Sequence, residues 1–451
     1  MARDRRPSSL HQLRRYVACH HVVRGWHSGE HLARTPPARG CARHLTQESI
    51  VMRVLFTGGG TGGHLYPTLS LARALLRADG EAGLCTAPRA PDDVQAPSSD
   101  APDEVLFIGA RGKVDQKLLE RDGIPHVTLG SSPLRGSSVV ETVGGLSRNA
   151  VATAQAMRIV SRFRPDVVVA SGGYASAPAV IASAWLRAAG LLRNTKIVLL
   201  EPNVIPGHAN RRLARFADEV WGGYDNTGTS HHFREKFRLI GIPVRPELVT
   251  PLSQADARRS LGLQPDGFLV LVFGGSQGAR TLNVATSGMV AHRRLPAHWQ
   301  ILHISGERDF EWMTAERRAE PNDNRYSLLP YVDDMALAYR AADLAVCRSG
   351  ASTLAELAAV GLPAIFVPYP HAADNHQRAN ADHFVDHGAA LIMQDELLTS
   401  DSLYWMLMDT AETSKLQGLQ TALRKLSHPQ ALAVMVERIA RAKVGSLGSA
   451  A

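Results

Sequence analysis

The sequence has few cysteines and no long apolar run. Its four cysteines, Cys19, Cys41, Cys85 and Cys347, form no CxxC pair and have no regular spacing, which argues against a disulfide framework and a structural zinc site. No stretch reaches the roughly 18 consecutive apolar residues that a membrane-spanning helix needs. We therefore expect a protein of a reducing cytoplasm that meets a membrane only from its surface.

Acidic residues are scarce in residues 1–51, which contain nine arginines, no lysine and only Asp4, Glu30 and Glu48. This segment supplies +6 of the formal charge of +8, so overall charge gives little support to nucleic-acid binding. Because the segment also lacks the apolar region of a secretory signal, we expect a disordered or misassigned basic leader before a folded chain that starts at Met52. The alternative is a basic arm that touches anionic lipid.

After Met52, short apolar runs alternate with longer helical patterns, which predicts strand-helix units and parallel sheets. A first series of strands is expected at residues 53–57, 104–108, 167–170, 196–200 and 219–222. A second series is expected at residues 268–273, 300–304, 325–329, 344–347, 364–367 and 390–392. Four prolines between residues 86 and 103 and their acidic and serine neighbours indicate a flexible insertion before the second strand.

Two prolines, Pro243 and Pro246, follow Gly241 and indicate a domain boundary. We predict an α/β fold of two doubly wound domains in tandem. The first domain would span residues 52–243 and the second residues 244–451, with the last helix packing back on the first domain.

Both series of strands begin with an apolar strand that runs into glycines, at residues 54–64 and 269–278. A glycine turn between a strand and a helix exposes backbone N–H groups at the helix N-terminus, which favours a phosphate or diphosphate. Two such loops suggest a phosphorylated ligand held between the domains. Glycines present only for tight packing would explain one loop more easily than two with polar tips.

Other enzyme classes fit the glycine loops less well. Gly58, Gly60 and Gly63 match the GxGxxG pattern of dinucleotide-dependent oxidoreductases, but the second strand does not end in the acidic residue that would hold a ribose. A P-loop kinase would need a Gly-Lys-Ser/Thr sequence, which follows neither loop. No DxD pair suggests a metal-dependent transferase, and we expect neither a metal nor a cofactor.

His64 follows the first glycine loop directly, at the start of the next helix. A lone histidine is usually structural, but one beside a phosphate-type loop is well placed for proton transfer or for a hydrogen bond to an acceptor. Helix dipoles, together with a cation such as Arg245, could stabilise a leaving diphosphate.

Seven motifs in this order resemble the MurG family of peptidoglycan glycosyltransferases, glycosyltransferase family 28. They are Gly58–His64, Ser171–Tyr174, Glu201–Asn203, Gly241–Arg245, Gly274–Gly278, Tyr331–Met335 and Arg348–Glu356. The resemblance implies transfer of N-acetylglucosamine from UDP-N-acetylglucosamine to the 4-hydroxyl of lipid I, giving lipid II with inversion at the anomeric carbon. It also implies the GT-B fold, in which two Rossmann-like, doubly wound domains face a central cleft. A further implication is a role in cell-wall synthesis, and through it in cell shape and division.

The resemblance also implies roles for individual residues. His64 would lie near the acceptor as the candidate base, and Glu356 would bind the ribose hydroxyls. The remaining residues implied in substrate binding are Thr61, Gly62 and Gly63 beside the transferred sugar, Asn203 and Gln377 at the sugar, Arg245 and Ser276 at the diphosphate, Val332 at the uracil, and Ala351, Ser352, Thr353, Leu354 and Ala355 at the start of a helix facing the α-phosphate. The sequence departs from the family at Leu200 and Pro202, where His and Gln are common.

A lipid-linked acceptor implies a peripheral position at the cytoplasmic face of the cell membrane, with other cell-wall synthesis proteins as candidate partners. Apolar and basic residues around Pro133–Arg148 and the Tyr174 loop have the mixed character of a membrane-facing surface, although an ordinary loop and helix would look the same. Two alternatives stay open: another sugar-nucleotide enzyme of this fold, such as a UDP-N-acetylglucosamine 2-epimerase or a small-molecule glycosyltransferase, and a catalytically silent membrane-associated scaffold.

Overall fold

The structure is a computed structural model that describes residues 52–59, 62–79, 104–111, 113–132, 139–275, 277–293, 295–318 and 325–448. The basic leader at residues 1–51 and the insertion at residues 86–103 were singled out from the sequence and lie outside the described residues.

The first domain is built on a parallel sheet with the strand order β3-β2-β1-β4-β5-β6-β7. Its strands are β1 (Arg53–Thr57), β2 (Glu104–Ala110), β3 (His126–Leu129), β4 (Val167–Ala170), β5 (Lys196–Glu201), β6 (Glu219–Gly222) and β7 (Phe237–Leu239). Its helices are α2 (Gly62–Asp79), α3 (Lys113–Arg121), α4 (Val139–Phe163), α5 (Ser176–Ala188) and α6 (His208–Leu213), with short 3-10 turns η1 (Asp225–Thr229) and η2 (Arg234–Lys236).

The second domain repeats this plan with the parallel order β10-β9-β8-β11-β12-β13. Its strands are β8 (Phe268–Phe273), β9 (Trp299–Ile304), β10 (Tyr326–Leu329), β11 (Leu344–Cys347), β12 (Ala364–Phe366) and β13 (Leu391–Ile392). Its helices are α7 (Gln254–Ser260), α8 (Arg280–His292), α9 (Glu307–Arg318), α10 (Met335–Ala341), α11 (Ala351–Val360), α12 (His376–Asp386), α13 (Ser400–Thr410) and α14 (Thr413–Lys425), with turns η3 (Pro246–Leu248), η4 (Ala373–Asn375) and η5 (Asp395–Leu397).

The central strands are apolar because helices cover both faces of each sheet. Strands β4, β9 and β11 are buried along their whole length. The predicted α/β fold with two doubly wound sheets is confirmed, and the predicted strands differ from the observed ones by at most two residues at an end. Two edge strands were missed: β3 has four residues, β7 has three, and their residues are mostly half-buried or exposed, so neither forms an apolar run.

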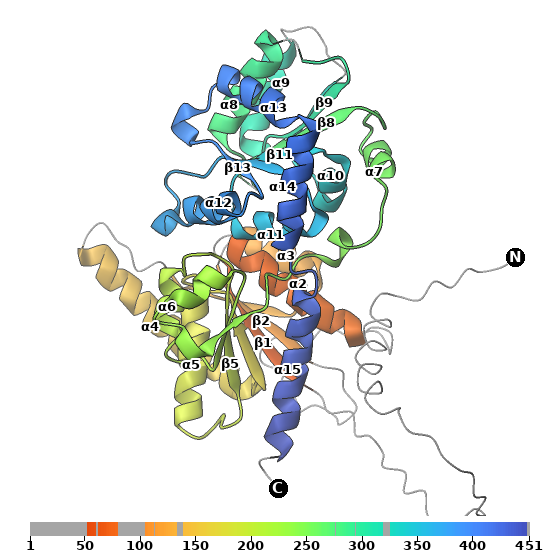
Figure 1. Ribbon diagram of the computed structural model, residues 1–451. Helices are drawn as coiled ribbons and strands as arrows, with labels where there is room; N and C mark the ends of the chain where they lie inside the picture. The colour runs from red at the N-terminus through yellow and green to blue at the C-terminus, as the bar shows by residue number, and fades with distance from the viewer. Residues whose placement is uncertain are drawn as a thin grey trace, which may run out of the picture.

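The helix α15 (Ala431–Gly448) follows the second domain but packs on the first. Its residues Met435 and Ile439 are buried with Val54 and Trp221, which belong to the first sheet. Figure 1 shows α15 in dark blue beside the first domain, while α14 lies against the second. The chain therefore crosses between the domains twice, near residue 241 and near residue 428.

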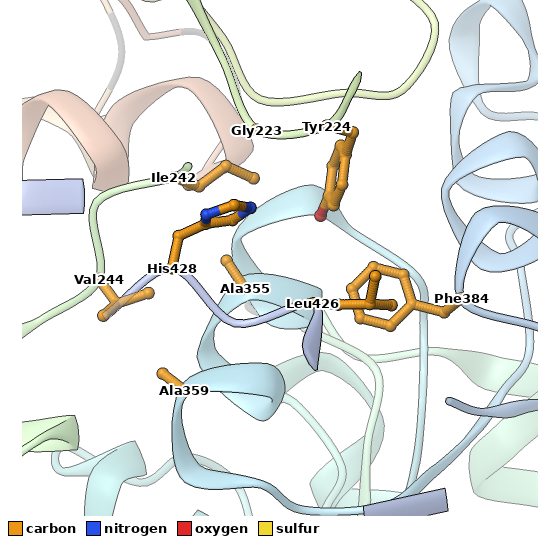
Figure 2. Close-up of a pocket in the computed structure, with 9 residues that line it drawn as sticks. All are labelled: Gly223, Tyr224, Ile242, Val244, Ala355, Ala359, Phe384, Leu426 and His428. Carbon is orange, nitrogen blue, oxygen red and sulfur yellow. The ribbon is translucent and has the colours of Figure 1, made fainter. Parts of the chain in front are cut away.

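The two crossings are in close contact at Gly241 and His428. Gly241 has a φ of +103°, and a Cβ added to it would lie 2.3 Å from the Cβ of His428. The cavity beside them measures only about 10 Å³, close to the space that one water needs. Figure 2 shows His428 in this cavity together with Ile242 and the Tyr224 side chain. Only glycine fits position 241 without moving the second crossing.

We predict that Gly241→Ala lowers the free energy of unfolding by roughly 1–3 kcal/mol more than Gly262→Ala does. Gly262 is the matched control because it also has a positive φ, +69°, but no atom lies within 4 Å of its added Cβ. Urea unfolding of the two variants measures the difference. Equal losses would show that backbone conformation alone, and not contact between the crossings, accounts for the glycine.

Candidate active site

Strand order reverses beside the first strand of each sheet, at β1 and β4 and again at β8 and β11. In parallel α/β sheets, ligands bind in the crevice that such a reversal leaves at the carboxyl ends of the strands. The motifs singled out from the sequence follow these strands, and α2, after the first glycine loop, packs against α11 of the second domain. In Figure 1 both helices lie where the two domains meet.

The loops after β1 and β4 are fastened to each other. The backbone N–H of Ser171 donates to the carbonyl of Thr57 at 3.0 Å. The hydroxyl of Ser176 lies 3.2 Å from the carbonyl of Thr57 and 2.6 Å from that of Gly172. Gly59 and Gly172 both have a positive φ, so this corner of the first domain is shaped by backbone that favours glycine.

Several predicted site residues are described only in part. Gly62, Gly63 and His64 form the first turn of α2, as expected, but their side chains are outside the described set. Thr61 and Ser276 lie wholly outside the described residues.

The carboxylate of Glu201, at the end of β5, organises the next loop from a fully buried position. Its Oε1 accepts the backbone N–H of Asn203 at 3.0 Å and the side-chain amide of Asn203 at 3.2 Å. Its Oε2 accepts the N–H of Gly207 and the amide of Asn210, both at 2.9 Å. Burial raises the pKa of Glu201, and these hydrogen bonds offset part of that shift. Asn203 is therefore held in one orientation.

Asn210 links this loop to the one after β4. A Cβ added to Gly172 would lie 2.9 Å from the side chain of Asn210, so the two loops touch. No sequence pattern indicated Asn210, because only the fold brings it to Glu201. Glu201 itself was recognised within a motif but was assigned no role.

The glycine loop after β8 is packed against the loop after β9. Gly278 has a φ of +71°, and a Cβ added to it would lie 2.1 Å from the carbonyl oxygen of Ser305. Gly274 is equally crowded by Ala279, whereas no atom of the described residues lies within 4 Å of a Cβ added to Gly275. Contacts at Gly274 and Gly278 thus fix the loop, while Gly275 leaves room for a ligand to approach the backbone.

A buried polar cluster supports this loop. His303 on β9 is fully buried, and its ring nitrogens lie 2.8 Å from the hydroxyl of Tyr326 and 3.0 Å from Oδ1 of Asn283. The amide of Asn283 donates to the carbonyl of Ser305 at 2.9 Å and to Asp309 at 2.8 Å. Burial lowers the pKa of His303 to about 3, so the imidazole is neutral near pH 7.

Helix α11 begins at Ala351, as predicted, directly after β11. Gly350 precedes it with an extended backbone and no side chain that caps the helix. The hydroxyl of Ser352 in the first turn is buried and has no hydrogen-bond partner among the described residues. Ala351 and Leu354 are buried in the core, so they can offer a ligand only backbone groups. Uncapped N–H groups at a helix N-terminus suit an anion.

The Glu356 carboxylate on α11 is held from two sides. Nε and Nη2 of Arg245 lie 3.1 and 3.0 Å from its Oε1. The hydroxyl of Tyr339 on α10 donates to its Oε2 at 3.0 Å. Burial raises the pKa of Glu356, while the charge of Arg245 and the hydrogen bond from Tyr339 oppose the rise. The two residues predicted at the diphosphate and the ribose are therefore direct neighbours.

Two tyrosines join this group without having been predicted. Tyr339 lies 17 positions before Glu356, and no sequence pattern links the two. Tyr66 comes from α2 of the first domain; burial raises its pKa, and the charges of Arg245 and Glu356 act on its hydroxyl. Beside this cluster a pocket of about 450 Å³ separates the domains, lined by Arg73, Leu76, Arg121 and Asp122 on one side and by Arg245, Glu247, Asp333, Asp334 and Ala336 on the other.

Gln377, in the first turn of α12, faces the loop after β12. Its Oε1 accepts the backbone N–H of Tyr369 at 2.9 Å, and its carbonyl accepts the hydroxyl of Ser349 at 2.7 Å. The bond to Oε1 fixes which end of the side-chain amide faces Tyr369. The amide nitrogen at the other end can donate to a ligand. Val332, predicted at the uracil, is buried in the same core as Leu354.

The chain matches two models of one family. Residues 54–221 match the glycosyltransferase family 28 N-terminal domain, and residues 269–432 match its C-terminal domain.

Similar proteins cover nearly the whole folded chain. A Moorella thermoacetica protein named UDP-N-acetylglucosamine--N-acetylmuramyl-(pentapeptide) pyrophosphoryl-undecaprenol N-acetylglucosamine transferase is 34% identical, over 86% of this chain and 98% of its own length. A Halothermothrix orenii protein of the same name is 31% identical, over 88% of this chain and 100% of its own length. The crystal structure of Acinetobacter baumannii MurG is similar with a TM-score of 0.63 and 27% identity, over 86% of this chain and 99% of that one.

Burial of His303, which supports the glycine loop after β8, predicts that the free energy of unfolding depends on pH. A histidine whose pKa falls from about 6.5 to about 3 on folding stabilises the protein above pH 6.5, and that contribution is lost as the pH falls. Between pH 7 and pH 5, the free energy of unfolding should fall by about 2 kcal/mol more in this protein than in a His303→Gln variant. Urea unfolding at several pH values measures both curves, and parallel curves would contradict the prediction.

Proposed function

The chain belongs to glycosyltransferase family 28, and we propose that it transfers N-acetylglucosamine from UDP-N-acetylglucosamine to the 4-hydroxyl of lipid I. Lipid I is an undecaprenyl diphosphate that carries N-acetylmuramoyl-pentapeptide, and the product is lipid II of peptidoglycan synthesis. The names of the relatives state the same donor sugar and the same kind of acceptor. The observation that carries the proposal is that each domain has a strand-order reversal with a glycine loop, after β1 and after β8, and that α2 and α11, which start at these two reversals, pack together.

The second domain has the features of a nucleotide site. The uncapped N-terminus of α11 and the unpartnered hydroxyl of Ser352 suit the diphosphate. The Glu356 carboxylate suits the ribose hydroxyls, and Arg245 beside it supplies a positive charge for the phosphates. Ser276 would add a hydroxyl at the diphosphate, and the backbone at Val332 would meet the uracil.

The transferred sugar would lie between Gln377 of the second domain and Asn203 of the first. Gln377 would donate to a sugar hydroxyl, because its oxygen already accepts the N–H of Tyr369. Thr61, Gly62 and Gly63 would line the opposite side, next to the acceptor. In this arrangement the anomeric carbon faces the first turn of α2.

The reaction would be a single displacement. The acceptor 4-hydroxyl attacks the anomeric carbon, its proton passes to the imidazole of His64, and the bond to the β-phosphate oxygen breaks with its electron pair leaving on UDP. One displacement inverts the α-linkage to β. A neutral histidine suits the base role near pH 7, and the N-terminus of α11 with Arg245 would stabilise the charge that develops on the diphosphate.

A lipid-linked acceptor would bring the first domain to the cytoplasmic face of the membrane. Helix α4 exposes Leu146 and Val151, which are 63% and 59% accessible, with Arg148 exposed between them. Apolar and basic side chains together favour a membrane surface. Among the described helices, none combines the length and the apolar character that crossing a bilayer requires.

We predict that the full chain transfers labelled N-acetylglucosamine from its UDP donor to a soluble lipid I analogue, with no loss of rate in EDTA. His64→Ala should lower the rate at least about 100-fold, because a positioned base contributes that much or more. His292→Ala is the matched control, since His292 is exposed at the end of α8.

Each other outcome points elsewhere. Release of free UDP or of an epimerised sugar without transfer would favour another sugar-nucleotide enzyme of this fold, such as a 2-epimerase. Binding of lipid I with no chemistry would favour a silent scaffold. A His64→Ala variant that keeps the parent rate would refute only the role of the base.

We also predict that Gln377→Glu raises the KM for UDP-N-acetylglucosamine by about ten-fold or more and changes UDP affinity less than two-fold. A carboxylate still accepts the N–H of Tyr369 but has no N–H to donate to the sugar. Steady-state kinetics and calorimetry with UDP measure the two values. Gln420→Glu is the control, because Gln420 donates to the carbonyl of Gly361 away from the cleft. Equal effects in both variants would contradict the proposed contact between Gln377 and the sugar.

A further inference from the structure

Asn380 on α12 is a fully buried polar side chain that bonds to both domains. Its Oδ1 accepts the backbone N–H of Val204, in the first domain, at 3.0 Å. Its Nδ2 donates to Oδ1 of Asn203 at 3.1 Å and to the carbonyl of Ser349, in the second domain, at 3.3 Å. One amide group therefore bridges the loop after β5 and the loop after β11.

Further hydrogen bonds hold Asn203, the side-chain partner of Asn380 in the first domain, in place. Glu201 fixes both the backbone and the side-chain amide of Asn203, which leaves Oδ1 of Asn203 pointing to Asn380. The hydroxyl of Thr227 donates to the Asn203 carbonyl at 2.9 Å. The Asn203 loop is thus rigid, and Asn380 is its link to the other domain.

The partner of Asn380 on the second domain leads to the proposed donor site. Ser349 is fully buried, and it precedes Gly350 and the N-terminus of α11. Its hydroxyl donates to the carbonyl of Gln377. Asn380 therefore connects the Asn203 loop to the loop that leads into the proposed donor site.

Asn380 has no donor left for a ligand. A side-chain amide has two N–H groups, and both are taken by Asn203 and Ser349. A direct hydrogen bond from Asn380 to a sugar hydroxyl would break one of these contacts. A buried amide of this kind stabilises a fold only when its partners are present, because unpaired polar groups are costly to bury.

We propose that Asn380 is a positioning residue that sets the closed arrangement of the two domains around the transferred sugar. It holds Asn203 of the first domain in register with the Ser349 loop and α11 of the second. This inference rests on the proposed transfer reaction and adds to it the residue through which the acceptor-side loop and the donor-side helix are aligned.

The test is a double-mutant cycle with Asn380→Ala, Asn203→Ala and the double variant, assayed by transfer to a soluble lipid I analogue. Asn380→Ala should lower kcat by about ten-fold or more and leave UDP affinity within two-fold, because the side chain acts through Asn203. In the Asn203→Ala background the same change should cost less than about three-fold. A ten-fold loss in both backgrounds, or no loss in either, would overturn the proposal.

A second measurement reports the contact itself. The Val204 amide should exchange with deuterium faster in Asn380→Ala, whereas Asn226→Ala should leave it unchanged. Asn226 is the matched control because its exposed side chain also bridges the domains, 3.4 Å from His383, and among the described residues it has no hydrogen bond to Asn203. Unchanged exchange at Val204 in Asn380→Ala would contradict the bridge.

Loss of folding is separated from loss of positioning by UDP binding. If Asn380→Ala fails to bind UDP, Asn380→Asp replaces it in the same cycle, since a carboxylate still accepts the Val204 N–H, while the two donors are replaced by an oxygen that faces the acceptor oxygens of Asn203 and Ser349. Absence of transfer in the parent protein would refute the proposed function, whereas an active parent with additive variants would refute only the role of Asn380.

Discussion

The reversal of strand order at the carboxyl ends of β1 and β4, and again at β8 and β11, decides where this protein can bind its substrates. At each reversal the loops leave the sheet in opposite directions and open a crevice. Glycines let the backbone approach a ligand there, and a helix N-terminus supplies uncapped N–H groups. A two-substrate transfer needs one such corner for each substrate and a fixed relation between the two.

That fixed relation depends on buried polar groups as well as on apolar packing. The chain crosses between the domains at Gly241 and His428, where the contact is too close for any side chain at position 241. Within the cleft, Glu201 fixes Asn203, and Asn380 joins Asn203 to the loop before α11. Arg245 and Tyr339 hold Glu356 in the same way. This part of the site is rigid because Glu201, Asn380 and Glu356 each have several partners.

Local patterns predicted most of the fold, because apolar strands that run into glycines are readable without a structure. The edge strands β3 and β7 were missed since half-exposed segments of three or four residues give no apolar run. Of the site, Arg245, Glu356 and Gln377 were predicted through their motifs and still await a test of their roles. Tyr339, Asn210 and Tyr66 carried no signal, because their contacts join elements that are distant in sequence.

The most direct test of the account is a crystal structure of the protein with UDP-N-acetylglucosamine. The account predicts the diphosphate at the N-terminus of α11, the ribose hydroxyls on Glu356, the sugar within reach of Gln377, and the bridge from Asn380 to Asn203 intact. A nucleotide bound instead at the glycine loop after β1, or a bound state in which Asn380 leaves Asn203 for the sugar, would contradict it.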